Sequence, residues 1–172
     1  MNNKPLILLV GKSGSGKTTI AEYLEKHYGM KMLRSYTTRP MRKPNEDGHI
    51  FVTKDDFNAM PHKVAHTFFD NHDYWATQEQ CDASDVYVID PDGVKSLKRN
   101  YLSTRPYYTI YLQVNPFVRL WRMYKRDKSI AKSLKRIVHD HNKFGHFEPH
   151  FYVKRDTVAN MAHQIYDWWC DA

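Results

Sequence analysis

The feature that most constrains this chain is an apolar stretch that runs directly into a glycine-rich loop. Residues Leu6–Val10 are all aliphatic, a pattern typical of a strand buried on both faces of a sheet. The loop that follows, Gly11–Thr18, reads G-K-S-G-S-G-K-T, and a helical pattern begins at Ile20–Leu24. The motif G-x-x-x-x-G-K-T therefore lies in the strand–loop–helix context that a phosphate-binding loop requires.

Each part of this loop is suited to holding phosphate. The glycines let the backbone turn tightly and bring its N–H groups close to an anion, and the helix that begins near Lys17 adds a partial positive charge. We expect Lys17 to reach the β- and γ-phosphates and the Thr18 hydroxyl to ligate Mg²⁺. An ordinary glycine-rich turn is the alternative, but it does not explain why the G-x-x-x-x-G-K-T motif lies between a predicted strand and a predicted helix. A nucleoside triphosphate is expected to bind along Gly11, Ser13, Gly14, Ser15, Gly16, Lys17, Thr18 and Thr19.

Composition narrows the class of protein. A length of 172 residues favours a single domain, and 41% hydrophobic with 26% charged residues is typical of a globular protein in water. No apolar run approaches the ~18 residues of a membrane span, so no membrane partner is expected. The two cysteines, Cys81 and Cys170, form no C-x-x-C pattern and suit a reducing cytoplasm. The net charge of +7 fits a polyanionic ligand, either nucleotides or nucleic acid, and does not choose between them.

Strand and helix patterns alternate along the chain, which indicates an α/β fold with a parallel sheet. Lys31–Ser35 is a predicted second strand, and Asp85–Asp90 is an apolar strand that ends in a carboxylate. In such folds an aspartate at the carboxyl end of a core strand can hold Mg²⁺, so Asp90 is a candidate metal ligand, with Asp92 able to share the work. A turn formed by Asp-Pro-Asp-Gly is compatible with that role.

Between these strands lies a polar loop that carries Arg39 and Arg42 together with two prolines. Guanidinium groups suit bidentate capture of a phosphate dianion, although a solvated basic loop is an equally good explanation of the spacing alone. Short apolar stretches follow at His49–Val52, Val64–Phe69 and Asp73–Thr77. They predict a small β-rich insertion between the two halves of the fold.

Basic residues are concentrated again in the segment Arg119–Arg136. Asn115 is a predicted helix cap, and Arg122 and Arg126 are four residues apart, so they lie on one helix face. Two basic helices joined by a short connection are expected to form a lid over phosphates. A solvated face or a nucleic-acid patch remains the alternative.

The ordered set of motifs resembles the guanylate kinase family over nearly the whole chain. Besides the phosphate loop, the segments that carry the resemblance are Ser35–Arg42, Glu46–Gly48, Tyr74–Thr77, Val86–Val94 and Arg122–Arg136. The pattern S-x-T-T-R-x-x-R at this distance from the phosphate loop is the specific part. The phosphate loop alone is shared by a far larger superfamily.

The resemblance implies a three-layer P-loop kinase fold in a single domain, with the core at 1–35 and 84–172, a β-rich acceptor-binding insertion at about 36–83 and a helical lid at about 122–145. It implies phosphoryl transfer from Mg·ATP to GMP or dGMP. The implied acceptor-binding residues are Ser35, Arg39, Arg42, His49, Asp70, Trp75, Thr77 and Asp92. The implied catalytic residues are Lys17, Arg122, Arg126 and Arg136, and the implied Mg²⁺ ligands are Thr18 and Asp90.

The sequence departs from the family in the acceptor pocket. His49 stands where the family has a tyrosine, Trp75-Ala76-Thr77 replaces tyrosine-glycine-threonine, and Asp70 is shorter than the usual guanine-reading glutamate. The acceptor therefore stays open between GMP or dGMP, another nucleotide and a sugar phosphate such as ribose 1,5-bisphosphate. A non-catalytic interaction module on the same fold is a further alternative. The expected partners are small-molecule nucleotides, with no nucleic acid and no membrane.

Overall fold

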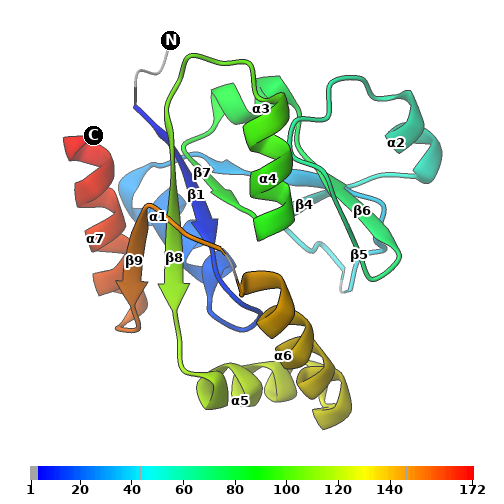
Figure 1. The fold of residues 1–172 in the computed structure, drawn as a ribbon, viewed down its shortest axis with the longest axis vertical. Helices are drawn as coiled ribbons and strands as arrows, with labels where there is room; N and C mark the ends of the chain where they lie inside the picture. Colours follow the sequence, from blue (N-terminus) through cyan, green and yellow to red (C-terminus); the bar gives the residue numbers. More distant parts are fainter. Residues whose placement is uncertain (1–3, 43, 146) are drawn as a thin grey trace.

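The core of the protein is a parallel sheet with the apolar N-terminal strand in its middle (Figure 1). The computed structural model describes residues 4–42, 44–145 and 147–172. The strand order is β2-β7-β1-β8-β9, and every neighbouring pair is parallel. The strands are β1 (Leu6–Val10), β2 (Met32–Leu33), β7 (Val86–Val88), β8 (Tyr107–Gln113) and β9 (Phe151–Lys154). The expected α/β class with a central parallel sheet is confirmed.

Strand β1 is buried on both faces, as its unbroken apolar sequence predicts. Ile7 and Leu9 pack into a cluster with residues of two helices, while Leu8 and the other even-numbered residues pack against a third helix on the opposite face. No residue of β1 is more than 2% exposed. The helices on the first face are α1 (Lys17–Tyr28) and α7 (Val158–Asp171), and α4 (Pro91–Asn100) covers the second.

Two further helices form a hairpin that projects from the carboxyl end of β8, at the bottom of Figure 1. α5 (Pro116–Asp127) begins after the predicted cap Asn115, whose side chain accepts from the Phe117 N–H, and α6 (Ile130–Phe144) begins after Ser129. In the described part of the chain, no helix combines the length and the apolarity that crossing a bilayer requires.

A second sheet is formed by the chain between β2 and β7. Its order is β4-β3-β6-β5, with β3 and β4 parallel and the other pairs antiparallel. Its strands are β3 (Ser35–Thr37), β4 (His49–Phe51), β5 (Thr67–Phe69) and β6 (His72–Trp75). Two short helices, α2 (Lys54–Ala59) and α3 (Gln78–Ala83), each begin with a capping box on a threonine.

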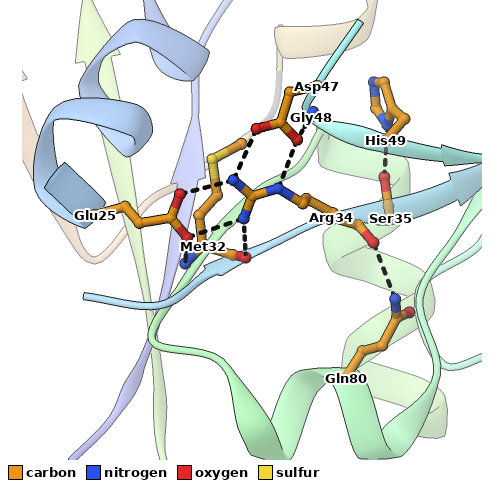
Figure 2. Close-up of polar contacts among 8 residues, drawn as sticks. All are labelled: Glu25, Met32, Arg34, Ser35, Asp47, Gly48, His49 and Gln80. Carbon is orange, nitrogen blue, oxygen red and sulfur yellow. Dashed lines mark hydrogen bonds and ion pairs between the residues drawn. The ribbon is translucent and has the colours of Figure 1, made fainter. Parts of the chain in front are cut away.

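The prediction of one continuous strand over Lys31–Ser35 is wrong. β2 ends at Leu33 in the core sheet and β3 begins at Ser35 in the second sheet, so Arg34 alone joins them. Figure 2 shows the reason. The Arg34 carbonyl accepts from the Gln80 side chain at 2.9 Å instead of from a neighbouring strand, and its side chain is held by two carboxylates.

Those carboxylates belong to different parts of the fold. The Arg34 guanidinium donates to Glu25 on α1 at 2.7 and 2.9 Å and to Asp47, in the loop before β4, at 2.7 and 3.0 Å (Figure 2). Hydrogen bonds from Arg34 lower the pKa of Glu25, and they lower the pKa of Asp47 to about 2. The ion pairs therefore fasten the second sheet to helix α1 of the core.

We predict that Arg34→Ala lowers the free energy of unfolding at pH 7 by roughly 1 kcal/mol, a value kept small because these groups are partly exposed. The lowered pKa values of Glu25 and Asp47 mean that the ion pairs stabilise the fold above about pH 4. The difference from wild type should therefore shrink as the pH falls through about 2. Urea titrations between pH 7 and pH 2 measure it. The control, Arg99→Ala, removes an exposed arginine and should change little at any pH.

Candidate functional site

The phosphate-binding loop follows β1 at the carboxyl edge of the core sheet. Its bends fall at Gly14 and Gly16, whose φ angles of 77° and 95° are in the left-handed region that favours glycine. A Cβ on Gly14 would lie 2.8 Å from the Arg119 carbonyl oxygen, so this glycine also lets α5 approach the loop closely. Gly16 precedes α1, whose first turn has no side-chain cap. The N–H groups at this helix N-terminus are thus available to an anion.

Lys17 is the cation of this loop that lines the cavity described below. Its ammonium donates to the Gly11 carbonyl oxygen at 2.6 Å and forms no ion pair with a carboxylate of the described residues. Loss of hydration lowers its pKa to about 8, although the nearby Asp140 and Asp90 carboxylates oppose the shift. An anion bound at the loop would therefore meet a poorly hydrated positive charge, against which electrostatic attraction is strong.

A cavity of about 480 Å³ opens in front of the loop and extends to the second sheet and the α5–α6 hairpin. This volume is in the range of small-molecule sites. Most of the residues proposed from the sequence line it: Gly11, Ser13, Gly14, Gly16, Lys17, Thr18, Thr19, Ser35, Arg42, His49, Asp90, Arg122, Arg126 and Arg136. Six others do not: Ser15, Arg39, Asp70, Trp75, Thr77 and Asp92.

The second sheet contributes a wall with a neutral imidazole and a free cation. His49 and Ser35 are paired across β4 and β3, and the Ser35 hydroxyl and the His49 Nδ1 are 3.0 Å apart. Burial, together with the charge of Arg39, lowers the pKa of His49 to about 4. The Arg42 guanidinium makes no ion pair within the described ranges. Burial and then the neighbouring Arg39 lower its pKa, so it belongs to a concentration of positive charge.

Arg39, predicted beside Arg42 as the second phosphate-gripping arginine, points elsewhere. Its guanidinium is buried and bound by Glu46 at 2.9 and 3.2 Å and by the Pro40 carbonyl oxygen at 2.8 Å. Only its Nε has no hydrogen-bond partner in the part of the chain that the structure describes. Glu46, which follows in the same loop, therefore neutralises Arg39 and leaves Arg42 as the exposed cation of the pair.

The other proposed residues outside the cavity have identifiable local roles. Trp75 is fully buried between the rings of Tyr36 and Phe57. Thr77 is the N-cap of α3, because its hydroxyl accepts from the Gln80 N–H. Asp70 lies in the turn between β5 and β6 with a φ of 51°. None of these three residues lines the cavity.

The hairpin lines the opposite wall with arginines. Arg122 donates to the Gly14 and Ser15 carbonyl oxygens at 3.3 Å each, which ties α5 to the phosphate loop. Arg126 and Arg136 both bind Asp127, at 2.8 and 3.2 Å. Hydrogen bonding to Arg126 lowers the pKa of this carboxyl group, so it remains charged and holds the two arginines together beside the cavity.

An ion pair that the sequence analysis missed anchors α6 to the loop. The Asp140 carboxylate accepts from the Ser13 N–H at 2.8 Å and from the Arg119 guanidinium at 2.8 Å, while Arg119 Nε donates to the Ser13 carbonyl oxygen at 2.9 Å. Both charged side chains are buried. The only sequence signal is that Arg119 lies four residues before the buried Met123, on the helix face that turns inward.

A second missed residue, Lys143, lies one turn after Asp140. Its ammonium binds Asp90 at 2.6 Å and Asp92 at 2.9 Å. Asp90 is also the N-cap of α4, because its Oδ1 accepts from the Gly93 N–H at 2.8 Å. The described residues contain no group of three or more His, Cys, Asp or Glu side chains that could enclose a metal. One carboxylate and the Thr18 hydroxyl nevertheless fit Mg²⁺, which usually takes its remaining ligands from water and phosphate.

We predict that the His49 imidazole stays neutral between pH 8 and pH 5, because its pKa is lowered to about 4 by burial and by Arg39. An unperturbed histidine would titrate near 6.5. NMR of the ring resonances across this range, assigned with His49→Gln, measures the midpoint directly. A midpoint near 6.5 would contradict the lowered pKa of this half-buried ring.

The fold resembles solved kinases. A guanylate kinase from Anaplasma phagocytophilum matches with a TM-score of 0.62 and 16% sequence identity, over 98% of this chain and 86% of that one. A sugar kinase from Janibacter sp. HTCC2649 matches with a TM-score of 0.55 and 17% identity, over 98% of this chain and 95% of that one. At these identities the likeness shows the fold. A comparison with curated proteins finds no match.

The sequence also matches the AAA domain family AAA_18 over residues 7–142, which is well over half of the chain. The matched region begins in β1 and ends in α6, so it includes the phosphate loop and all the cavity-lining residues except Lys143 and Phe144. The protein therefore belongs to the AAA domain family AAA_18 and has a P-loop kinase-like fold.

Proposed function

We propose that this protein transfers the γ-phosphoryl group of Mg·ATP to a small phosphorylated acceptor, with a nucleoside monophosphate, GMP or dGMP, as the first candidate. The observation that carries the proposal is one cavity lined by cations from three parts of the fold. Lys17 lies on the phosphate loop, Arg42 in the loop between β3 and β4, and Arg126 and Arg136 on the α5–α6 hairpin. Two anionic groups could meet there with their repulsion neutralised.

The donor half follows from the loop. The N–H groups around Gly14–Lys17 would hold the β- and γ-phosphates, with Lys17 as their cation. Thr18 and Asp90 would hold Mg²⁺, which supplies charge neutralisation between the phosphates when bound. The same residues argue against a non-catalytic interaction module, since such a module has no need of an intact phosphate loop beside a free lysine.

The transfer needs positioning and electrostatic stabilisation more than covalent chemistry. The acceptor phosphate oxygen attacks the γ-phosphorus of ATP, the bond from that phosphorus to the β–γ bridging oxygen breaks, and ADP leaves. With GMP as acceptor the products are ADP and GDP. Arg126 and Arg136, which line the cavity, would stabilise the charge on the phosphoryl group during transfer, and no nucleophilic side chain is required.

The acceptor half favours recognition of phosphate over recognition of guanine. Ser35, Arg42 and His49 line the cavity, but Asp70, the residue proposed to read guanine, does not. A second candidate acceptor is therefore another nucleotide or a sugar phosphate such as ribose 1,5-bisphosphate. The similarity to the Janibacter sugar kinase fold is compatible with this alternative.

The test of the proposal is ADP formation from Mg·ATP across a panel of GMP, dGMP, other nucleoside monophosphates and sugar phosphates. We expect acceptor-dependent turnover with one member of this panel. Lys17→Ala should reduce it by at least ~10²-fold, since it would remove the cation proposed to contact the β- and γ-phosphates. Circular dichroism would verify that the variant is folded. The proposal would be contradicted if no member of the panel supported ADP formation, or if Lys17→Ala left the acceptor-dependent ADP formation unchanged.

Arg126 and Arg42 should separate in their kinetic effects, because they are assigned to different phosphates. Arg126→Ala should lower kcat by roughly 10³-fold while changing the acceptor KM little, as expected for an arginine that acts on the transferring group. Arg42→Ala should mainly raise the acceptor KM. Lys125→Ala, next to Arg126 but stacked on the exposed Trp121, is the control. If Arg126→Ala and Arg42→Ala changed kcat and the acceptor KM to the same extent, the two arginines would not act on different phosphates as proposed.

A further inference from the structure

The end of α6 places an ammonium group on the two carboxylates that follow β7. Lys143 Nζ lies 2.6 Å from Asp90 Oδ2 and 2.9 Å from Asp92 Oδ2, and its side chain is only 11% exposed. The Lys143 stem passes the Phe69 ring on β5, with Nζ 5.9 Å from the ring centroid. Lys143 thus reaches across the cavity from the hairpin to the edge of the core sheet.

The position of Lys143 is fixed by the turn of helix that precedes it. Asp140 is held by the Ser13 N–H and by Arg119, both at 2.8 Å, in contacts that are almost completely buried. Residues three apart lie on the same face of a helix. The backbone of α6 is therefore anchored to the phosphate loop, and Lys143 reaches the two carboxylates through its four-carbon side chain.

Asp90 has only one oxygen to offer a cation. Its Oδ1 accepts from the Gly93 N–H at 2.8 Å and caps α4, so this oxygen is committed to the fold. The remaining oxygen, Oδ2, is the one that Lys143 binds. An ammonium and a divalent cation cannot both approach the same carboxylate oxygen closely, because their charges repel strongly at such separations.

Lys143 also differs from Lys17 in its partners. Lys17 donates to backbone carbonyl oxygens and has no carboxylate partner in the described ranges, so its charge is left for an anion. Lys143 instead binds two carboxylates, those of Asp90 and Asp92. Its charge is therefore directed at the side of the cavity where a metal would bind.

We propose that Lys143 is a built-in competitor for the divalent cation: its ammonium occupies Asp90 and Asp92 until a divalent cation displaces it. This inference rests on the proposed function only for the assignment of Asp90 as the metal ligand. The displaced ammonium would remain tethered beside the phosphate loop through Asp140. Metal binding would then free a positive charge at the site where a nucleotide polyphosphate is expected.

The test uses the full chain and Mn²⁺ alone, with free Mn²⁺ measured by electron paramagnetic resonance in the absence of nucleotide. Lys143→Gln should bind Mn²⁺ about tenfold more tightly than wild type, a change equivalent to ~1.4 kcal/mol. Lys143→Arg retains the positive charge and should stay close to wild type. Lys132→Gln makes the same change in net charge at an exposed position of α6 and should also leave Mn²⁺ affinity near the wild-type value.

Adding Asp90→Asn to Lys143→Gln should abolish the gain, which would locate the metal at Asp90. An equal or weaker Mn²⁺ affinity in Lys143→Gln, or a gain that survives Asp90→Asn, overturns the proposal. Thermal unfolding of each variant verifies that it is folded. The outcome is separate from that of the kinase proposal. A tighter, Asp90-dependent Mn²⁺ site without phosphoryl transfer would reject the kinase function alone, and transfer without the gain would reject only the competition.

Discussion

The constraint on which this structure depends is the burial of β1 on both faces. Apolar side chains that point to both sides of a strand require helices on each side, which α1 and α7 provide on one face and α4 on the other. Because all neighbouring strands are parallel, their carboxyl ends meet at one edge of the sheet. The phosphate loop, Asp90 and the start of α5 all follow strands that end there. The donor half of the site is thus a direct consequence of how the core is built.

The placement of carboxylates decides which of the many basic side chains keep an unpaired positive charge at the cavity. Glu46 neutralises Arg39 and Asp140 neutralises Arg119, in both cases inside the protein. Arg42 retains its free charge on the cavity wall. The net charge of +7 therefore says less about the site than the identity of the few cations that no acidic side chain has taken.

Features governed by neighbouring residues could be predicted from the sequence. Asn115 caps α5 as predicted, because its side chain accepts from the Phe117 N–H two residues later. The phosphate loop was identified with its glycines in place, since its backbone geometry is encoded within eight residues. Each of these depends on contacts within one turn of chain, where residue type and spacing carry the physical information.

Features governed by distant residues could not be predicted in this way. Asp140 contacts Ser13 across 127 positions of sequence, and Lys143 meets Asp90 across 53. The break at Arg34 depends on Glu25 and Asp47 together. The segment Lys31–Ser35 contains no trace of either partner, so it was predicted to be one strand. The ion pair between Arg39 and Glu46 was missed because the sequence does not show that these two side chains lie close together.

The close approach at Gly14 has a mechanical consequence. With no side chain on this residue, the crest of the phosphate loop rests against the backbone of α5 at Arg119, leaving no room for a Cβ between them. The start of α5 is therefore packed tightly on the loop, and Asp140 fastens the later part of α6 to the same loop. Any bending of the hairpin relative to the core has to occur in the part between Arg119 and Asp140, which carries Arg126 and Arg136.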